Sequence, residues 1–220
     1  MLTSISPKDV KNIKAFIKLQ SRGPFKHLND KKCSSPQSEY IVRASISEYK
    51  NIYHCAVAQA WLDVCRNVEI NEDNKSKIFW AKDLIANSLQ AYFIGKPKNS
   101  EAFESWYDSL LSNSTTNTTL TVGQAQKIIN MSFKYLFCCA DIRNNKLSHF
   151  TGCHMPLDSV TLEWLGMKGL IWNSIDDPML YSWIIDFARN KANNSNLLLK
   201  DFEIWEPKTK GNKTTQLYPE

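Results

Sequence analysis

Hydrophobic residues recur three and four positions apart along most of the chain. Near the start, Ser6-Pro7 has the form of a helix N-terminus, and Val10, Ile13 and Phe16 then mark one apolar face. The same spacing predicts further helices over 39–68, 77–93, 101–111, 120–139, 158–172, 178–190 and 197–205. No stretch alternates convincingly with a period of two. The pattern therefore predicts an all-α protein of about nine helices.

Polar segments separate these stretches. Gly23-Pro24 ends the first helix, 30–38 and 112–119 are polar connections, and 140–154 is expected to be a loop. A chain of 220 residues is long enough for one core or for two lobes that share a cleft. We expect one helical domain of two lobes over residues 1–206 and a flexible C-terminal tail over 207–220.

Composition narrows the class further. Seven glycines are few for a turn-rich β protein of this length. The net charge of +5 is mildly basic, and lysine and arginine outnumber the acids up to Lys50. This excess is typical either of a solvated helix face or of a surface that follows a phosphate backbone.

Six cysteines include no CxxC pair, and the N-terminus is too polar to be an export signal. No apolar run approaches the length of a membrane span. The sequence therefore predicts a cytoplasmic protein with reduced thiols and no membrane association.

The stretch 128–139 is apolar at nearly every position, which predicts a helix buried on most sides. Lys127 lies in its first turn, and Lys134, seven residues on, falls on the same face. Burial favours the neutral amine that a nucleophilic lysine needs, although both side chains can instead extend to solvent along the helix. Gly123, in a turn ahead of this stretch, can expose backbone N–H groups to a phosphate.

Pro156-Leu157-Asp158 precedes the next helix, and Asp158 stands at its expected N-cap. Capping alone is enough to explain an aspartate there. A carboxylate at a helix start is also held in its ionised form, suited to stabilise a cation or accept a proton.

The order and spacing of these blocks resemble the helix-hairpin-helix DNA glycosylases, most closely the archaeal 8-oxoguanine DNA glycosylases. The matching features, spread over about 120–205, are Gln126-Lys127 with Lys134, Pro156-Leu157-Asp158, Gly169-Leu170-Ile171, and Asp201 followed by Trp205. The family's Leu-Pro-Gly-x-Gly hairpin is reduced here to Leu120-Thr-Val-Gly123. The four-cysteine iron–sulfur loop of the endonuclease III relatives is missing after Asp158.

The resemblance implies a two-lobed helical bundle with a helix-hairpin-helix-like element and an active-site cleft between the lobes. It implies a monomer that acts, without metal or cofactor, on double-stranded DNA containing a modified base: an oxidised purine, or a modified base of phage DNA. Lys127 would attack C1′ of the extruded nucleotide, with β-lyase activity as a possible companion, and Asp158 would stabilise the developing positive charge. The base pocket would contain Asp201, Trp205 and His154, and the DNA contacts would be Gly123, Gln124, Gln126 and Lys134.

Three alternatives remain at this point. Arg143 and His149 have the Arg-x5-His spacing of HEPN-type ribonucleases, although Asn144-Asn145 suggests a turn between them. The chain can also be a non-catalytic helical DNA-binding module in which Lys127 contacts a phosphate. A zinc site is disfavoured, because adjacent helical cysteines diverge; it would draw on Cys138, Cys139, Cys153, His149 and His154.

Overall fold

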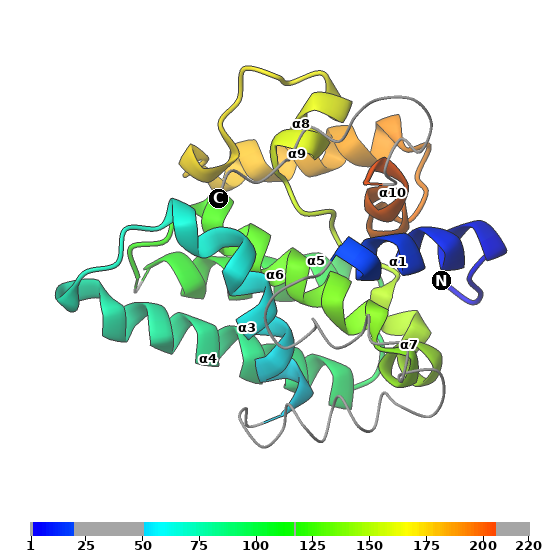
Figure 1. Cartoon of the computed structure of the whole chain (residues 1–220), viewed down its shortest axis with the longest axis horizontal. Coiled ribbons are helices and arrows are strands. Elements are labelled where there is room, and N and C mark those ends of the chain that lie inside the picture. Colours follow the sequence, from blue (N-terminus) through cyan, green and yellow to red (C-terminus); the bar gives the residue numbers. More distant parts are fainter. Residues whose placement is uncertain (1, 20–50, 117, 206–220) are drawn as a thin grey trace.

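The computed structural model describes residues 2–19, 51–116 and 118–205. These residues form nine α-helices and no β-strand, which confirms the all-α prediction (Figure 1). The helices are α1 (Pro7–Leu19), α3 (Ile52–Val64), α4 (Glu72–Ile94), α5 (Ser100–Thr116), α6 (Val122–Cys138), α7 (Ala140–Lys146), α8 (Ser159–Leu165), α9 (Pro178–Lys191) and α10 (Leu197–Ile204). Short 3-10 turns include η3 (Leu147–Phe150) and η4 (Trp172–Ser174).

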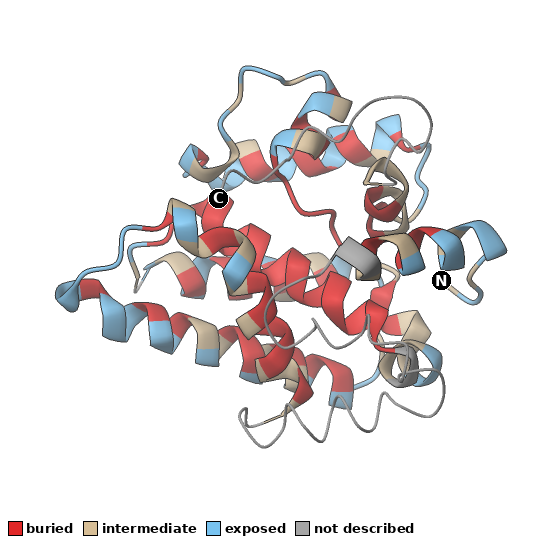
Figure 2. Cartoon of the chain, in the orientation of Figure 1, coloured by how far each residue is buried: buried red, intermediate tan, exposed pale blue. Residues whose placement is uncertain are grey.

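Helix α6 is the centre of the molecule, and each of its residues is buried (Figure 2). Its most extensive neighbour is α3, which places small residues such as Ala56 and Ala60 in the core and so allows close approach. Helix α5 also packs on α6, and α4 packs on α3 and α5. Because α6 is enclosed on all sides, its polar side chains need partners inside the protein.

Helices α8 and α9 pack against each other on one side of α6, and α4 lies on the opposite side (Figure 1). Helix α10 contacts both α8 and α1. This arrangement brings the start of α8 over α6 and sets α1 and α10 beside its C-terminal half. The lysines of α6 therefore face segments that lie far away in the sequence.

Several helix boundaries differ from the prediction for local reasons. Helix α4 begins at Glu72 because Asn71 and Asn74 form a capping box. Helix α5 continues through its polar end to Thr116, where the hydroxyls of Ser114 and Thr115 bond back to carbonyls of the preceding turn.

The helix predicted over 158–172 ends at Leu165, because Gly166 takes the left-handed conformation with φ of 89°. The predicted loop over 140–154 contains α7 and η3, so the turn expected at Asn144-Asn145 is wrong and both residues are helical. Since helix α7 is short and follows α6 directly, periodicity gave little signal for it.

Some predictions fall outside the described residues. These are the connection over 30–38, the first part of the helix predicted over 39–68, the tail over 207–220 and most of the basic N-terminal residues. Within the described residues, no helix combines the length and the apolar character needed to cross a bilayer.

Candidate active site

The N-terminus of α6 is set by Thr121 and Gln124, which form a capping box. The helix therefore begins at Val122, so Lys127 lies beyond the first turn and Gly123 lies inside the helix, contrary to the prediction. The Gly123 N–H donates to the Ile175 carbonyl at 2.7 Å. A Cβ at this position would lie 1.8 Å from the Trp172 carbonyl oxygen, so glycine is required for close packing of η4 on α6.

Lys127 and Asp158 meet across the interface between α6 and α8. The Nζ atom of Lys127 lies 3.6 Å from Oδ2 of Asp158, and the two side chains are 11% and 6% exposed. The ring of Trp172 covers the same amine, with its centroid 4.3 Å from Nζ. The Lys127 side chain thus stays inside the protein and does not extend to solvent.

The two carboxylate oxygens of Asp158 have different partners. Oδ1 accepts the backbone N–H groups of Val160 and Thr161, both at 3.0 Å, and caps α8. Oδ2 faces Lys127. Asp158 is therefore both the N-cap of α8 and the partner of a buried lysine.

Asp158 is positioned by polar side chains of α6. The Gln126 amide bonds Leu157 in both directions: Nε2 donates to its carbonyl at 3.0 Å, and Oε1 accepts its N–H at 3.1 Å. Asn130 donates to the Met155 carbonyl at 3.2 Å. These contacts hold the segment that leads into α8, so Asp158 cannot move without breaking buried hydrogen bonds.

Lys134 forms a second, more deeply buried pair. Its Nζ lies 2.5 Å from Oδ2 of Asp201, with side-chain exposures of 1% and 0%. Three rings surround the amine, with centroid distances of 4.0 Å for Phe16, 4.9 Å for Phe202 and 5.6 Å for Trp205. Burial raises the pKa of Asp201 to about 6, although Lys134 acts in the opposite direction.

Asp63 of α3 is a third carboxylate in this region, and no motif in the sequence marks it. It accepts a hydrogen bond from the hydroxyl of Tyr135 at 2.7 Å. Burial raises the pKa of Asp63, while Lys127 and Lys134 act to lower it. No sequence pattern indicates that a single acid within a helix will be buried near the lysines of another helix.

Several buried polar side chains have atoms without a hydrogen-bond partner within the described residues. They include Oδ1 of Asp201 and the Asn12 amide, whose oxygen and nitrogen are both unpaired. Asn12 lies one turn before Phe16 on α1, the helix that packs against α10. Unpaired buried atoms cost free energy unless a ligand or water satisfies them.

His154 belongs to a different cluster from Lys127. Its Nδ1 lies 2.9 Å from the Tyr181 hydroxyl and its Nε2 lies 3.0 Å from the Glu104 carboxylate, which also pairs with Arg189. Burial lowers the pKa of His154, against the opposite effect of Glu104. The structure thus places His154 apart from Asp201 and Trp205, the other residues predicted for the base pocket.

The four residues predicted to contact DNA are buried and have internal partners. Gln124 donates to the Asn67 carbonyl at 2.6 Å, in addition to its capping role. Gln126 holds the segment before Asp158, Lys134 pairs with Asp201, and the N–H of Gly123 is engaged by Ile175. These contacts link α6 to other segments of the protein.

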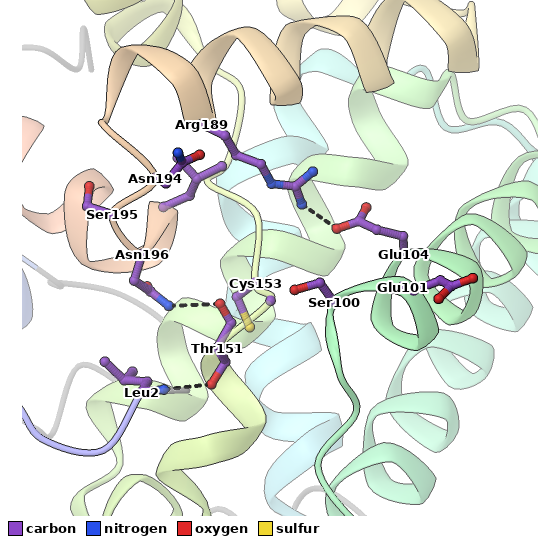
Figure 3. Close-up of a pocket in the computed structure, with 12 residues that line it drawn as sticks. Leu2, Ser100, Glu101, Glu104, Thr151, Cys153, Arg189, Asn194, Ser195 and Asn196 are labelled. Carbon is purple, nitrogen blue, oxygen red and sulfur yellow. Dashed lines mark hydrogen bonds and ion pairs between the residues drawn. The ribbon is translucent and has the colours of Figure 1, made fainter.

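A cavity of about 670 Å³ lies elsewhere, between the start of α5, residues 151–153 and the turn after α9 (Figure 3). The Arg189 and Glu104 side chains point toward each other across one side of this cavity. On another side, the Asn196 amide donates a hydrogen bond to the Thr151 carbonyl. Neither lysine pair lines this cavity.

The ribonuclease alternative requires Arg143 and His149 to converge. Arg143 donates to the Phe137 carbonyl at 2.9 Å. His149 lies flat on Phe93, with an interplanar angle of 17°, and Nε2 is 2.9 Å from the Gly95 carbonyl. The two side chains are thus directed to separate partners. Among the described residues, no group of three or more His, Cys, Asp or Glu is placed to hold a metal ion.

Comparison of the chain with protein-family models, with curated proteins and with solved structures finds no match. The geometry of the two lysine–aspartate pairs is therefore the basis for a functional conclusion.

Proposed function

We propose that this protein is a DNA glycosylase that uses Lys127 as its nucleophile and Asp158 as the supporting carboxylate. The observation that carries the proposal is the distance of 3.6 Å between Nζ of a buried lysine and Oδ2 of a carboxylate fixed at a helix N-terminus. Because Oδ1 is held by two backbone N–H groups, Oδ2 stays directed at the amine. A fixed amine–carboxylate pair of this kind is suited to attack on an electrophilic carbon.

The chemistry requires a neutral amine. Lys127 passes a proton to Asp158, and its nitrogen lone pair then forms a bond to C1′ of the extruded nucleotide. The N-glycosidic bond breaks, and its electron pair leaves with the base, which takes up a proton. Opening of the sugar ring gives a Schiff base at C1′, from which β-elimination breaks the 3′ C–O bond. Asp158 passes the proton it received to the departing base, and its carboxylate, ionised again, stabilises the positive charge that develops on the sugar.

Asp201, Trp205 and Asn12 are proposed to line the base pocket. Oδ1 of Asp201 is an unpaired buried acceptor, and the Asn12 amide is an unpaired donor and acceptor. A purine edge presents both N–H donors and carbonyl acceptors, so it can satisfy such groups. The proposal includes a pocket between two lobes, one built on α3 to α6 and one on α8 to α10, and a helix-hairpin-helix-like element ahead of α6.

Borohydride trapping on duplex DNA with a single abasic site tests the nucleophile without knowledge of the excised base. Reduction of the Schiff base forms a stable covalent protein–DNA adduct, which we expect for the native chain. Lys127→Ala should abolish the adduct. The matched control is Lys96→Ala, which removes an exposed lysine from the α4–α5 connection and should leave trapping unchanged.

Absence of an adduct with the native chain, or an equal adduct with Lys127→Ala, would overturn the lysine mechanism. Duplexes with different modified bases, including oxidised purines and modified cytosines of phage DNA, then identify the base that is released. If no base is released from any of them, the glycosylase assignment fails, and salt-dependent binding without abasic products would favour a DNA-binding module instead.

A further inference from the structure

The 3-10 turn η4 is attached to the N-terminus of α6 at several points. The Thr121 hydroxyl donates to the Asn173 carbonyl at 2.8 Å, and the Gly123 N–H donates to the Ile175 carbonyl at 2.7 Å. The absence of a side chain at Gly123 lets the Trp172 carbonyl lie where a Cβ would otherwise be. The backbone of η4 is thereby fixed relative to the helix that carries Lys127.

This attachment determines where the Trp172 ring lies. Its centroid is 4.3 Å from Nζ of Lys127, while Oδ2 of Asp158 lies 3.6 Å from the same atom. A ring face and a carboxylate therefore bound the amine on two sides. Both favour a positive charge on it, the carboxylate by direct attraction and the ring by its quadrupole.

From this geometry we infer that Trp172 is a positioning and specificity residue of the site, held by Gly123, which fixes the Lys127 amine beside Asp158 and forms the aromatic wall against which the extruded nucleotide lies. The inference rests on the proposed function. An atom attacked by Nζ must come within about 3–3.5 Å of it. The sugar must then lie close to the ring, and its base is within reach of stacking on it.

Substitution of Trp172 separates this role from simple packing. We use the whole chain, abasic duplex DNA and borohydride trapping, and measure adduct formation as a function of pH and of DNA concentration. In Trp172→Leu the ring face is lost, so the pH at which trapping is half-maximal should move lower. Loss of stacking should raise the KM for DNA about tenfold.

Trp172→Phe keeps an aromatic face and should restore both values to within about twofold of the native chain. The matched control is Trp183→Leu, which removes a tryptophan that is 57% exposed on α9 and should change neither value. Other charged groups near the amine are Asp158, Asp63, Lys134 and Asp201, and all of them are present in each of these variants.

Gly123→Ala tests the attachment itself. Its added methyl meets the Trp172 carbonyl and should displace η4, so the pH profile should move in the same direction while Lys127, Asp158 and Trp172 are all retained. Thermal unfolding shows whether Gly123→Ala folds. If it does not fold, the Trp172 variants alone test the inference.

The outcomes are distinct. If the native chain forms no adduct, the proposed function fails and the inference with it. If the native chain traps DNA but Trp172→Leu keeps its pH midpoint and its KM, the inference alone is wrong. A uniform loss of adduct at all pH values, with an unchanged KM, would show only a structural role and would also overturn it.

Discussion

Two lysine–aspartate pairs on one face of α6 differ in the distance between their charges, in their exposure to solvent and in the aromatic rings around them. Lys134 and Asp201 lie 2.5 Å apart and are almost fully excluded from solvent, whereas Lys127 and Asp158 lie 3.6 Å apart with a small exposed fraction. The first pair is surrounded by three aromatic rings. The second has one ring on the amine, and the other oxygen of its carboxylate caps a helix.

Under the proposed function, one helix carries a structural ion pair and a reactive one. A short contact beside three aromatic rings holds the charges of Lys134 and Asp201 in place, with no room between the two groups for a reacting atom. A longer contact at the N-terminus of α8 leaves the Lys127 side chain 11% exposed and sets beside it a carboxylate that can accept a proton. The position of each aspartate, one at a helix start and one within a helix, produces this difference.

The largest expected effect is on stability. Lys134→Met leaves Asp201 buried without its partner and should lower the free energy of unfolding by about 3–5 kcal/mol at pH 7.5. Lys127→Met should cost about 1 kcal/mol, since Asp158 keeps its bonds to the α8 N-terminus. Urea unfolding of both variants measures the difference.

The double variant Lys134→Met/Asp201→Leu is the control for this first prediction. Because it removes both charges, it should recover most of the lost stability. Equal losses for the two single lysine variants would contradict the distinction between the pairs.

A second prediction separates the two roles of Asp158. Asp158→Asn keeps an oxygen that can cap α8 but removes the negative charge facing Lys127, so trapping should slow about a hundredfold while stability changes by less than about 0.5 kcal/mol. Asp158→Ala should slow trapping equally and also cost about 1 kcal/mol through loss of the cap. Unchanged trapping in Asp158→Asn would show that capping is the residue's whole role.

The smallest expected effect concerns pH. Burial raises the pKa of Asp201 from 3.8 to about 6, so the folded protein binds this proton more tightly than the unfolded chain. The resulting stability is present below pH 3.8 and is lost as the pH rises through about 6. The difference in unfolding free energy between the native chain and Asp201→Asn should therefore fall by about 2 kcal/mol from pH 4 to pH 7. A difference that does not change with pH would place Asp201 outside a desolvated environment.

The sequence predicted more of the fold than of the site's internal geometry. Helices with strong apolar periodicity were identified, whereas α7 was missed because seven residues give too short a pattern. The capping box of Thr121 and Gln124 has a readable spacing that would have placed the start of α6 correctly. Asp63 and Asn12 carried no such signal, since their role depends on which helices pack beside them.

The sequence by itself determined that α6 is enclosed and that Lys127 and Lys134 share one face, because helical register follows from local backbone geometry. It also placed Asp158 at a helix start. Only the tertiary structure decided which aspartate each lysine meets, how far apart the charges lie and which rings cover them. Those distances depend on contacts between helices far apart in the chain, and packing, unlike register, is not a periodic property of the sequence.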